Sequence, residues 1–118
     1  MPSKSYLSMT RAKCKEMGRV TWKTEVWNPY AHIRQDLFGF IDALALGDNN
    51  IIAIQSTGPS GHSEHKRKIL NNEYAKRWLR CGGVIELWSF RKLKVKRCKK
   101  ASRWTPRVEQ ITLADFKV

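Results

Sequence analysis

Residues 34–57 read RQDLFGFIDALALGDNNIIAIQST and set Asp36 and Asp42 on a largely apolar segment ahead of a turn. The apolar run over residues 37–46 predicts a strand covered on both faces. Residues 47–50 form a turn cluster, so residues 51–55 predict the antiparallel partner strand of a hairpin. A carboxylate in such a strand is costly unless it is paired or bound to a metal. The stretch therefore predicts both the centre of a sheet and a candidate site.

Asp42 lies within FGFIDALAL, where its chain neighbours supply no positive partner. A magnesium ion, which prefers carboxylate, carbonyl and water oxygens, would compensate this charge. An exposed strand face is the simpler alternative. Asp36 shares the strand face of Asp42 if the strand is regular, because side chains alternate with period two. We expect Asp36 to be a second metal ligand or a water-positioning group, with pairing to Arg34 or Arg19 as the alternative.

The partner strand ends in neutral polar residues, Gln-Ser-Thr. In a hairpin that turns at residues 47–50, Asp42 and Gln55 lie at comparable distances from the turn. Gln55 and Thr57 share a face because they are two residues apart. We expect Asp42, Gln55 and Thr57 to converge at the open end of the hairpin, where the backbone carbonyl of Ser56 could add a further oxygen ligand.

The remaining segments predict helices and strands in a regular order. Ser5 can cap a helix over residues 5–17 that ends at Gly18, and Ser63 can cap a second helix over residues 64–80. Strands are expected at residues 20–26, 84–90 and 107–112, with a further one near 93–95. The fold class is α/β, a central mixed sheet flanked by helices. The 118 residues predict a single domain, with a core at about 5–90 and a basic extension over 91–118.

The chain carries 23 Lys+Arg against 10 Asp+Glu, a formal net charge of +13. So large a charge predicts a polyanionic partner, with nucleic acid ahead of an anionic membrane or an acidic protein. Five tryptophans favour a folded chain; most should be core, whereas Trp27 and Trp104 could stack on exposed bases. Three cysteines without a CxxC pair predict reduced thiols, and no apolar run is long enough to span a bilayer. We expect a soluble, cytoplasmic protein without a membrane partner.

The order helix, strand, Asp-bearing strand, partner strand, helix, strand resembles the PD-(D/E)XK nuclease superfamily, as does the thirteen-residue spacing between the two strand motifs. In length and spacing the chain resembles the small archaeal-type Holliday junction resolvases. RQDLFGFIDALAL, IQST and WLRCGGVIELWSFRK also look like a phage and bacterial group of small uncharacterised proteins placed with these nucleases. The resemblance covers about residues 5–90 and leaves the basic extension unexplained.

This resemblance implies a restriction-endonuclease-like core of helix-strand-strand-strand-helix-strand with a C-terminal β extension. It implies an Mg²⁺-dependent DNA endonuclease, with Mn²⁺ as a substitute, that is selective for branched DNA in the manner of a Holliday junction resolvase. Because two-fold branched DNA is best cut by a symmetric pair of sites, a homodimer is expected. The expected location is the cytoplasm of a bacterial or phage-infected host cell.

Under the resemblance, Asp42 matches the metal-binding aspartate of the superfamily. Gln55 stands where the family usually has Glu, and Thr57 where it usually has Lys. Gln can still donate a carbonyl oxygen to a metal, but Thr cannot supply a lysine's charge beside the phosphate. Lys66 and Lys68, just past the following loop, are candidates for the missing lysine; a solvated basic face that binds the DNA backbone is the alternative.

The family also carries a glutamate on its first helix. Glu16 lies twenty-six residues before Asp42 and is the expected match, as a catalytic and metal-ligating residue, with Glu25 in the first strand as the fallback. His62 and His65 have no third Cys or His nearby, which argues against zinc. Contact with phosphate or proton transfer suits these histidines better.

Three functions compete at this point: a structure-selective DNA endonuclease, a non-catalytic DNA-binding protein on a degenerate nuclease fold, and an RNA-binding or ribosome-associated basic protein. All three predict a basic surface. The residues expected to contact nucleic acid are Arg34, Lys66, Arg67, Lys68, Arg91, Lys92, Lys94, Lys96, Arg97, Lys99, Lys100 and Arg103.

Overall fold

A computed structural model describes residues 5–95 and 98–116 of the chain. Its main sheet has five strands in the order β1-β4-β5-β6-β7, and β5 and β6 run parallel while the other neighbours are antiparallel. The strands are β1 (Val20–Lys23), β4 (Ala43–Leu46), β5 (Ile51–Thr57), β6 (Val84–Val95) and β7 (Cys98–Ile111). A separate hairpin joins β2 (Val26–Asn28) and β3 (Ile33–Gln35). The helices are α1 (Tyr6–Glu16), α2 (His62–Leu70) and α3 (Ala75–Arg80), with a short 3₁₀ helix η1 (Leu113–Phe116).

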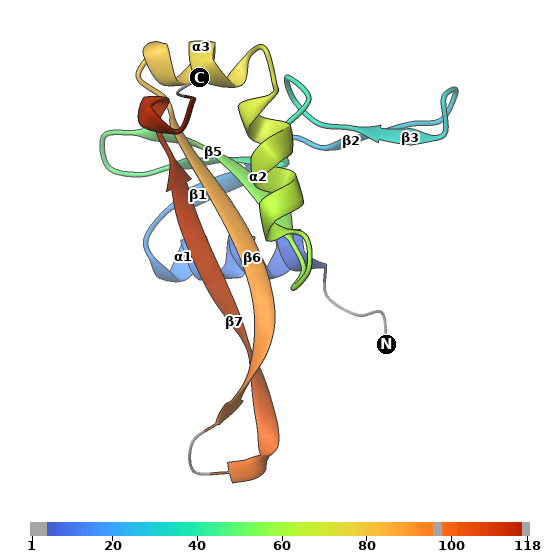
Figure 1. Cartoon of the computed structure of the whole chain (residues 1–118), viewed down its shortest axis with the longest axis vertical. Coiled ribbons are helices and arrows are strands. Elements are labelled where there is room, and N and C mark those ends of the chain that lie inside the picture. Colours follow the sequence, from blue (N-terminus) through green and yellow to red (C-terminus); the bar gives the residue numbers. More distant parts are fainter. Residues whose placement is uncertain (1–4, 96–97, 117–118) are drawn as a thin grey trace.

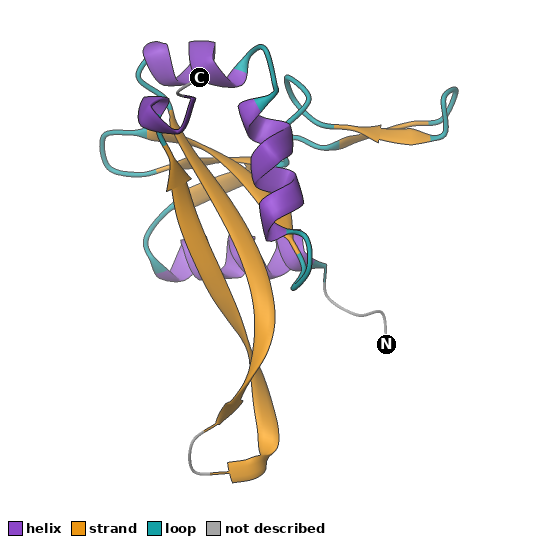
Figure 2. Ribbon diagram, in the orientation of Figure 1, coloured by secondary structure: helices purple, strands orange, loops and turns teal. Residues whose placement is uncertain are grey.

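The sheet is covered on both faces, as the apolar sequence of its central strands predicts. Helix α1 lies behind the sheet, and α2 and α3 lie in front of it (Figures 1 and 2). Helices α2 and α3 form the crossover between β5 and β6, which a parallel pair of strands requires. A mixed α/β sheet flanked by helices is thus confirmed.

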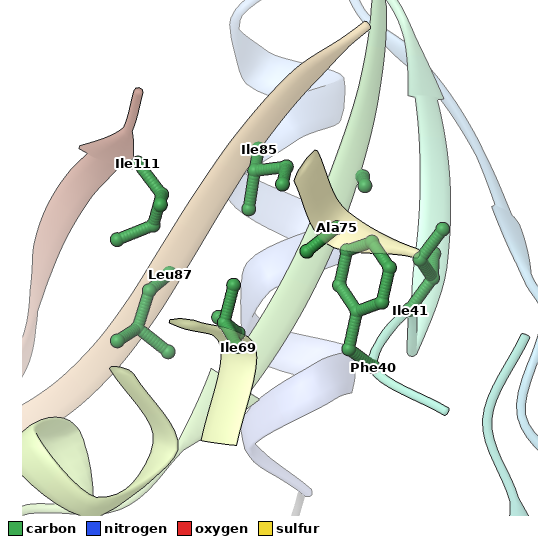
Figure 3. Close-up of a cluster of buried hydrophobic side chains, with 8 residues drawn as sticks. Phe40, Ile41, Ile69, Ala75, Ile85, Leu87 and Ile111 are labelled. Carbon is green, nitrogen blue, oxygen red and sulfur yellow. The ribbon is translucent and has the colours of Figure 1, made fainter. Parts of the chain in front are cut away.

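Strand β5 is buried on both sides because its alternating residues enter two separate cores. Ala53 belongs to the core beneath α2 and α3, together with Phe40, Ile69 and Leu87 (Figure 3). Ile52 and Ile54 belong to the other core, beneath α1. The continuous apolar run therefore reflects burial on two faces.

An ion pair ties the segment between α1 and β1 to strand β6. The Arg19 guanidinium donates to both carboxylate oxygens of Glu86 in β6, at 2.8 and 3.1 Å. Trp88 Nε1 donates to the same carboxylate at 3.0 Å. Glu86 is buried, so these three donors compensate the cost of placing its charge in the core.

Residues 37–42 are not the strand that their apolar character predicts. A tight turn closes there, with reciprocal backbone hydrogen bonds between Leu37 and Ile41 and positive φ values at Phe38 (55°) and Gly39 (83°). The apolar side chains of this turn still pack into the core, and Phe40 and Ile41 are buried there. The strand proper begins at Ala43.

The second predicted helix is in fact two, α2 and α3. The Asn72 side chain accepts the Tyr74 N–H at 2.8 Å and donates to the Phe38 carbonyl at 2.9 Å. Such side-chain bonds to the backbone compete with helical ones, so the helix breaks there. Gly61, rather than Ser63, stands at the N-cap of α2.

The β-structure also extends beyond its predicted edges. The predicted strand at 93–95 is the continuation of β6, and β7 is much longer than residues 107–112. The β2–β3 hairpin was not expected. Within the described ranges, no helix combines the length and the apolar character needed to cross a membrane.

Candidate metal centre

Three carboxylates meet at one edge of the fold. Glu25, Asp36 and Asp42 each bring one oxygen within 4.8 Å of the others. Glu25 lies between β1 and β2, Asp36 directly follows β3, and Asp42 directly precedes β4. The β2–β3 hairpin therefore begins and ends at this carboxylate cluster.

Backbone hydrogen bonds hold the three residues together. The N–H groups of Thr24 and Glu25 both donate to the Asp42 carbonyl, at 2.9 and 3.2 Å. The turn over residues 37–41 returns the chain from Asp36 to Asp42. The expected convergence of these two aspartates is found, but a tight turn produces it and not the alternation of a regular strand.

Asp42 also lies opposite the end of β5, as the hairpin register predicts. Its N–H donates to the Ile54 carbonyl at 2.8 Å, and Ala43 pairs with Ile54 in the ladder. The Ser56 N–H donates to Asp42 Oδ2 at 3.0 Å. Ser56 thus reaches the site by its N–H, whereas its hydroxyl bonds that of Thr10 at 2.7 Å on the α1 side.

The environment of Asp42 disfavours a lone negative charge. Burial first of all, and the neighbouring Asp36 and Glu25 to a smaller extent, raise the pKa of this carboxyl to about 7, against the lowering effect of the Ser56 N–H. A cation placed among the three carboxylates would stabilise the ionised form of Asp42.

Gln55 lines the same pocket as the three carboxylates, and this pocket has a volume of about 330 Å³. Its side chain is only 2% exposed, and its Oε1 has no hydrogen-bond partner among the described residues. A buried acceptor normally has a donor or a metal, because leaving it unsatisfied costs free energy. Three carboxylates and an amide oxygen form the all-oxygen donor set that suits Mg²⁺ or Mn²⁺.

Helix α2 presents one of its two candidate lysines to the pocket. Lys68 lines the pocket with its Nζ 3.7 Å from Asp36 Oδ2. Lys66 lies on another side of the helix, where its Nζ contacts Glu109 at 2.6 Å and Asp115 at 3.8 Å. The assignment of Lys66 to the catalytic site is therefore wrong, whereas Lys68 fits.

The two histidines of α2 divide in the same way as its two lysines: His65 lies on the side of Lys68, and His62 lies on the side of Lys66. His65, three residues before Lys68, lines the pocket, and its Nδ1 is buried without a partner among the described residues. Burial, and next the charge of Lys68, lowers the pKa of His65, so the ring is neutral at pH 7. His62 faces away and contacts Ser89 at 2.8 Å and Glu109 at 2.7 Å.

Two further predicted site residues lie outside the pocket. Glu16 is at the far end of α1, ten residues and about 15 Å from Tyr6, which lines the pocket. It is exposed and its carboxylate is 3.7 Å from Lys13, so Glu25, the fallback, is the third carboxylate. Thr57 is buried against the turn before α2, where a Cβ at Gly61 would collide with its Oγ1.

Sequence reasoning missed Lys23, at the end of β1, which also lines the pocket. The one available signal was its position two residues before Glu25, which on a strand places both side chains on one face.

The predicted nucleic-acid residues divide between several surfaces. Arg91, Lys92 and Arg103 are exposed on the long β6–β7 hairpin, and Arg67 is exposed on α2. Arg34 lies in β3, directly across the ladder from Trp27. The placements of Lys96 and Arg97, and the side chains of Lys94, Lys99 and Lys100, lie outside the described part of the structure.

The two tryptophans expected to be available for bases differ. Trp104 packs edge-on against Tyr6, at 5.7 Å between ring centroids, and Lys92 Nζ lies 5.1 Å from its ring centroid. Trp27 is exposed on β2. The Trp104 ring is thus partly covered by its packing partners, whereas about half of the Trp27 surface is accessible to solvent.

The fold and the site together define an α/β protein with a mixed five-stranded sheet and a pocket lined by three carboxylates, Gln55, two lysines and His65. No protein-family model, curated protein or solved structure matches this chain.

Proposed function

We propose that this protein is a metal-dependent DNA endonuclease with a restriction-endonuclease-like core, selective for branched DNA. The single observation that carries the proposal is the group of Glu25, Asp36 and Asp42, whose oxygens lie within 4.8 Å of one another beside the unpartnered Oε1 of Gln55. Lys23 and Lys68 line the same pocket, but a divalent cation held between the three carboxylates compensates their mutual repulsion most directly.

Glu25, Asp36, Asp42 and Gln55 would hold Mg²⁺, with Mn²⁺ as a substitute. A divalent cation bound there lowers the pKa of water and stabilises charge that develops on a phosphodiester. These four residues would hold the ion, and the Ser56 N–H, which donates to Asp42 Oδ2, fixes the orientation of that carboxylate.

Two side chains on α2 supply the remaining chemistry. Lys68 would offset the negative charge of the scissile phosphate, which makes it the counterpart of the lysine that Thr57 replaces. The neutral ring of His65 can accept a proton from the attacking water or pass one to the leaving oxygen.

Substrate affinity would come from the basic surface. Arg91, Lys92 and Arg103 on the β6–β7 hairpin contact backbone phosphates and give largely sequence-independent binding. Two copies of the chain would place two sites on a two-fold symmetric junction, so the active form would be a homodimer in the cytoplasm.

The proposal is tested by incubating the purified protein with a labelled four-way junction and Mg²⁺ or Mn²⁺. We expect cleavage with either metal, none with EDTA, and a rate at least about a hundredfold lower for Asp42→Asn with junction binding retained. Absence of cleavage by the wild-type protein across both metals and pH 6–9 would contradict it.

A second candidate is a non-catalytic DNA-binding protein on the same fold. The observation that favours it is the neutral pair Gln55 and Thr57, where the related nucleases usually carry an acid and a lysine. It predicts tight junction binding, no cleavage, and no effect of Asp42→Asn on either property.

A further inference from the structure

The β2–β3 hairpin forms an arm that projects from the side of the molecule (Figures 1 and 2). Its turn is held by Asn28, whose Oδ1 accepts the N–H groups of Tyr30 and Ala31 at 3.0 and 3.1 Å. This side-chain-to-backbone pattern is a stable turn, so the tip of the arm presents a defined surface.

The arm displays aromatic rings that are not used in either core. Tyr30 is 94% exposed and Trp27 is 54% exposed. The Trp27 ring meets His32 edge-on, with centroids 6.3 Å apart, which supports the ring and leaves much of its surface open. Exposed aromatic rings on a projecting element indicate a contact surface for a partner.

The arm is anchored at the metal centre. Glu25 immediately precedes β2 and Asp36 immediately follows β3, and both carboxylates belong to the cluster. Trp27 is two residues from Glu25, about 7 Å along a strand, which equals about two base steps of B-DNA. A base that contacts Trp27 therefore lies within a few nucleotides of a phosphate that binds a metal at the carboxylates.

The charge of the arm fits nucleic acid. Residues 26–35 contain Arg34 and no Asp or Glu, and the chain as a whole carries +13. Aromatic rings stack on unpaired bases of any sequence, whereas the cations of the β6–β7 hairpin suit the backbone. The two hairpins therefore offer different chemistry to one polyanion.

We infer that the β2–β3 arm stacks unpaired bases of DNA on Trp27 and Tyr30, within a few nucleotides of the phosphate at the metal centre. This inference rests on the proposed function for the position of that phosphate, and it names the feature of a branched substrate that is recognised: bases freed at the branch point.

The experiment measures binding in metal-free buffer, where cleavage does not interfere, to a forked DNA and to a duplex of equal length. We expect Trp27→Ala and Tyr30→Ala each to weaken binding of the fork about tenfold or more and to change duplex binding less than about twofold. Trp27→Phe and Tyr30→Phe should bind nearly as wild type, because stacking needs only a ring. Trp22→Ala, which removes an exposed tryptophan of β1 off the arm, is the matched control and should not discriminate between the two DNAs.

A direct readout uses 2-aminopurine at each position of the unpaired strand near the branch. Stacking on the arm should change its fluorescence at positions next to the branch for the wild type and not for Trp27→Ala. Alanine variants that bind fork and duplex like the wild type, or lose both equally, would overturn the inference. Fork-selective binding without any metal-dependent cleavage would instead overturn the proposed function and leave the arm's role standing.

Discussion

At the residue scale, Asp42 shows how an unfavourable charge marks a site. The sequence predicts that an acid in an apolar run needs compensation, and the structure supplies a hydrogen bond from the Ser56 N–H together with two further acids, Asp36 and Glu25. Without a cation, the burial of this carboxyl raises its pKa to about 7. The residue is therefore suited to a metal and costly without one.

This raised pKa predicts a pH-dependent stability. The folded state holds a proton on Asp42 between its ordinary pKa of 3.8 and about 7, so the stability linked to that proton is fully present below pH 4 and lost as the pH rises to 7. In EDTA, the free energy of unfolding of the wild type relative to Asp42→Asn should fall by about 2–4 kcal/mol over that range. Urea unfolding at several pH values measures it; parallel profiles for the two proteins would contradict it.

The sequence predicted part of the site, and the residues show why. Asp42 and Gln55 follow from hairpin register, a local rule that holds here. The expected closeness of Asp36 to Asp42 is found, but the strand geometry that predicts it does not exist, since a turn with positive φ at Phe38 and Gly39 brings the two residues together. Glu16 was chosen over Glu25 by analogy of position on a helix, and only the packing of α1 shows that it lies at the far end.

At the scale of the element, α2 directs its charged residues by helical spacing. His65 and Lys68 lie toward the pocket, whereas His62 and Lys66 lie toward Glu109 of β7. From sequence the two lysines were equivalent, because nothing local fixes the rotation of a helix that carries polar residues on several sides.

The two lysines form a matched pair for mutagenesis. Lys68→Ala should lower the cleavage rate by about tenfold or more with little change in stability, because it removes the cation beside the carboxylates. Lys66→Ala should cleave at close to the wild-type rate and lose up to about 1 kcal/mol of stability, as its partly exposed ion pair with Glu109 is removed. Single-turnover cleavage measures the rate of each variant, and thermal unfolding measures its stability. Equal rate losses in Lys68→Ala and Lys66→Ala would contradict the assignment of Lys68 alone to the site.

The largely buried ion pair between Arg19 and Glu86 joins the segment between α1 and β1 to strand β6. Glu86→Ala should lower the free energy of unfolding by about 3–5 kcal/mol, because it leaves the Arg19 guanidinium uncompensated. The double variant Arg19→Met with Glu86→Leu should recover much of that loss. Chemical denaturation provides the measurement, and a loss below about 1 kcal/mol for Glu86→Ala would show that the pair is not buried in solution.

Elements were predicted better than their edges. Amphipathic and apolar periodicity identified α1 and the β4–β5 hairpin, because each has a clear cap or turn signal. The β2–β3 arm escaped notice because Asn28-Pro29 reads as a break in the chain, whereas Asn28 instead stabilises the turn of a hairpin. The split between α2 and α3 depends on a contact of Asn72 with Phe38, thirty-four residues away, which no local pattern contains.

At the scale of the whole molecule, two hairpins extend from a small α/β body. The Cα radius of gyration is 15.2 Å, whereas a spherical domain of this length has about 13.5 Å. In the sequence, residues 91–103 contain eight Lys and Arg and no acid. The shape and the charge together fit a protein that holds a polyanion alongside its body.

Binding of DNA should therefore depend strongly on salt. A plot of log affinity against log salt concentration for a duplex should be steep, and replacing Arg91 and Arg103 together by Gln should reduce the slope by about 2. Fluorescence anisotropy between 50 and 300 mM salt measures the slope. An unchanged slope would mean that these exposed arginines do not contact phosphates.

The central claim is that Glu25, Asp36, Asp42 and Gln55 form a divalent-metal site. The most direct measurement is the anomalous difference map of crystals grown with Mn²⁺, collected on wild type and Asp42→Asn. The account predicts a strong peak among the three carboxylates, about 2.0–2.4 Å from their oxygens and from Gln55 Oε1, that is lost in the variant. A map with no peak there at saturating Mn²⁺, or with the Lys68 ammonium at that point, would contradict the account.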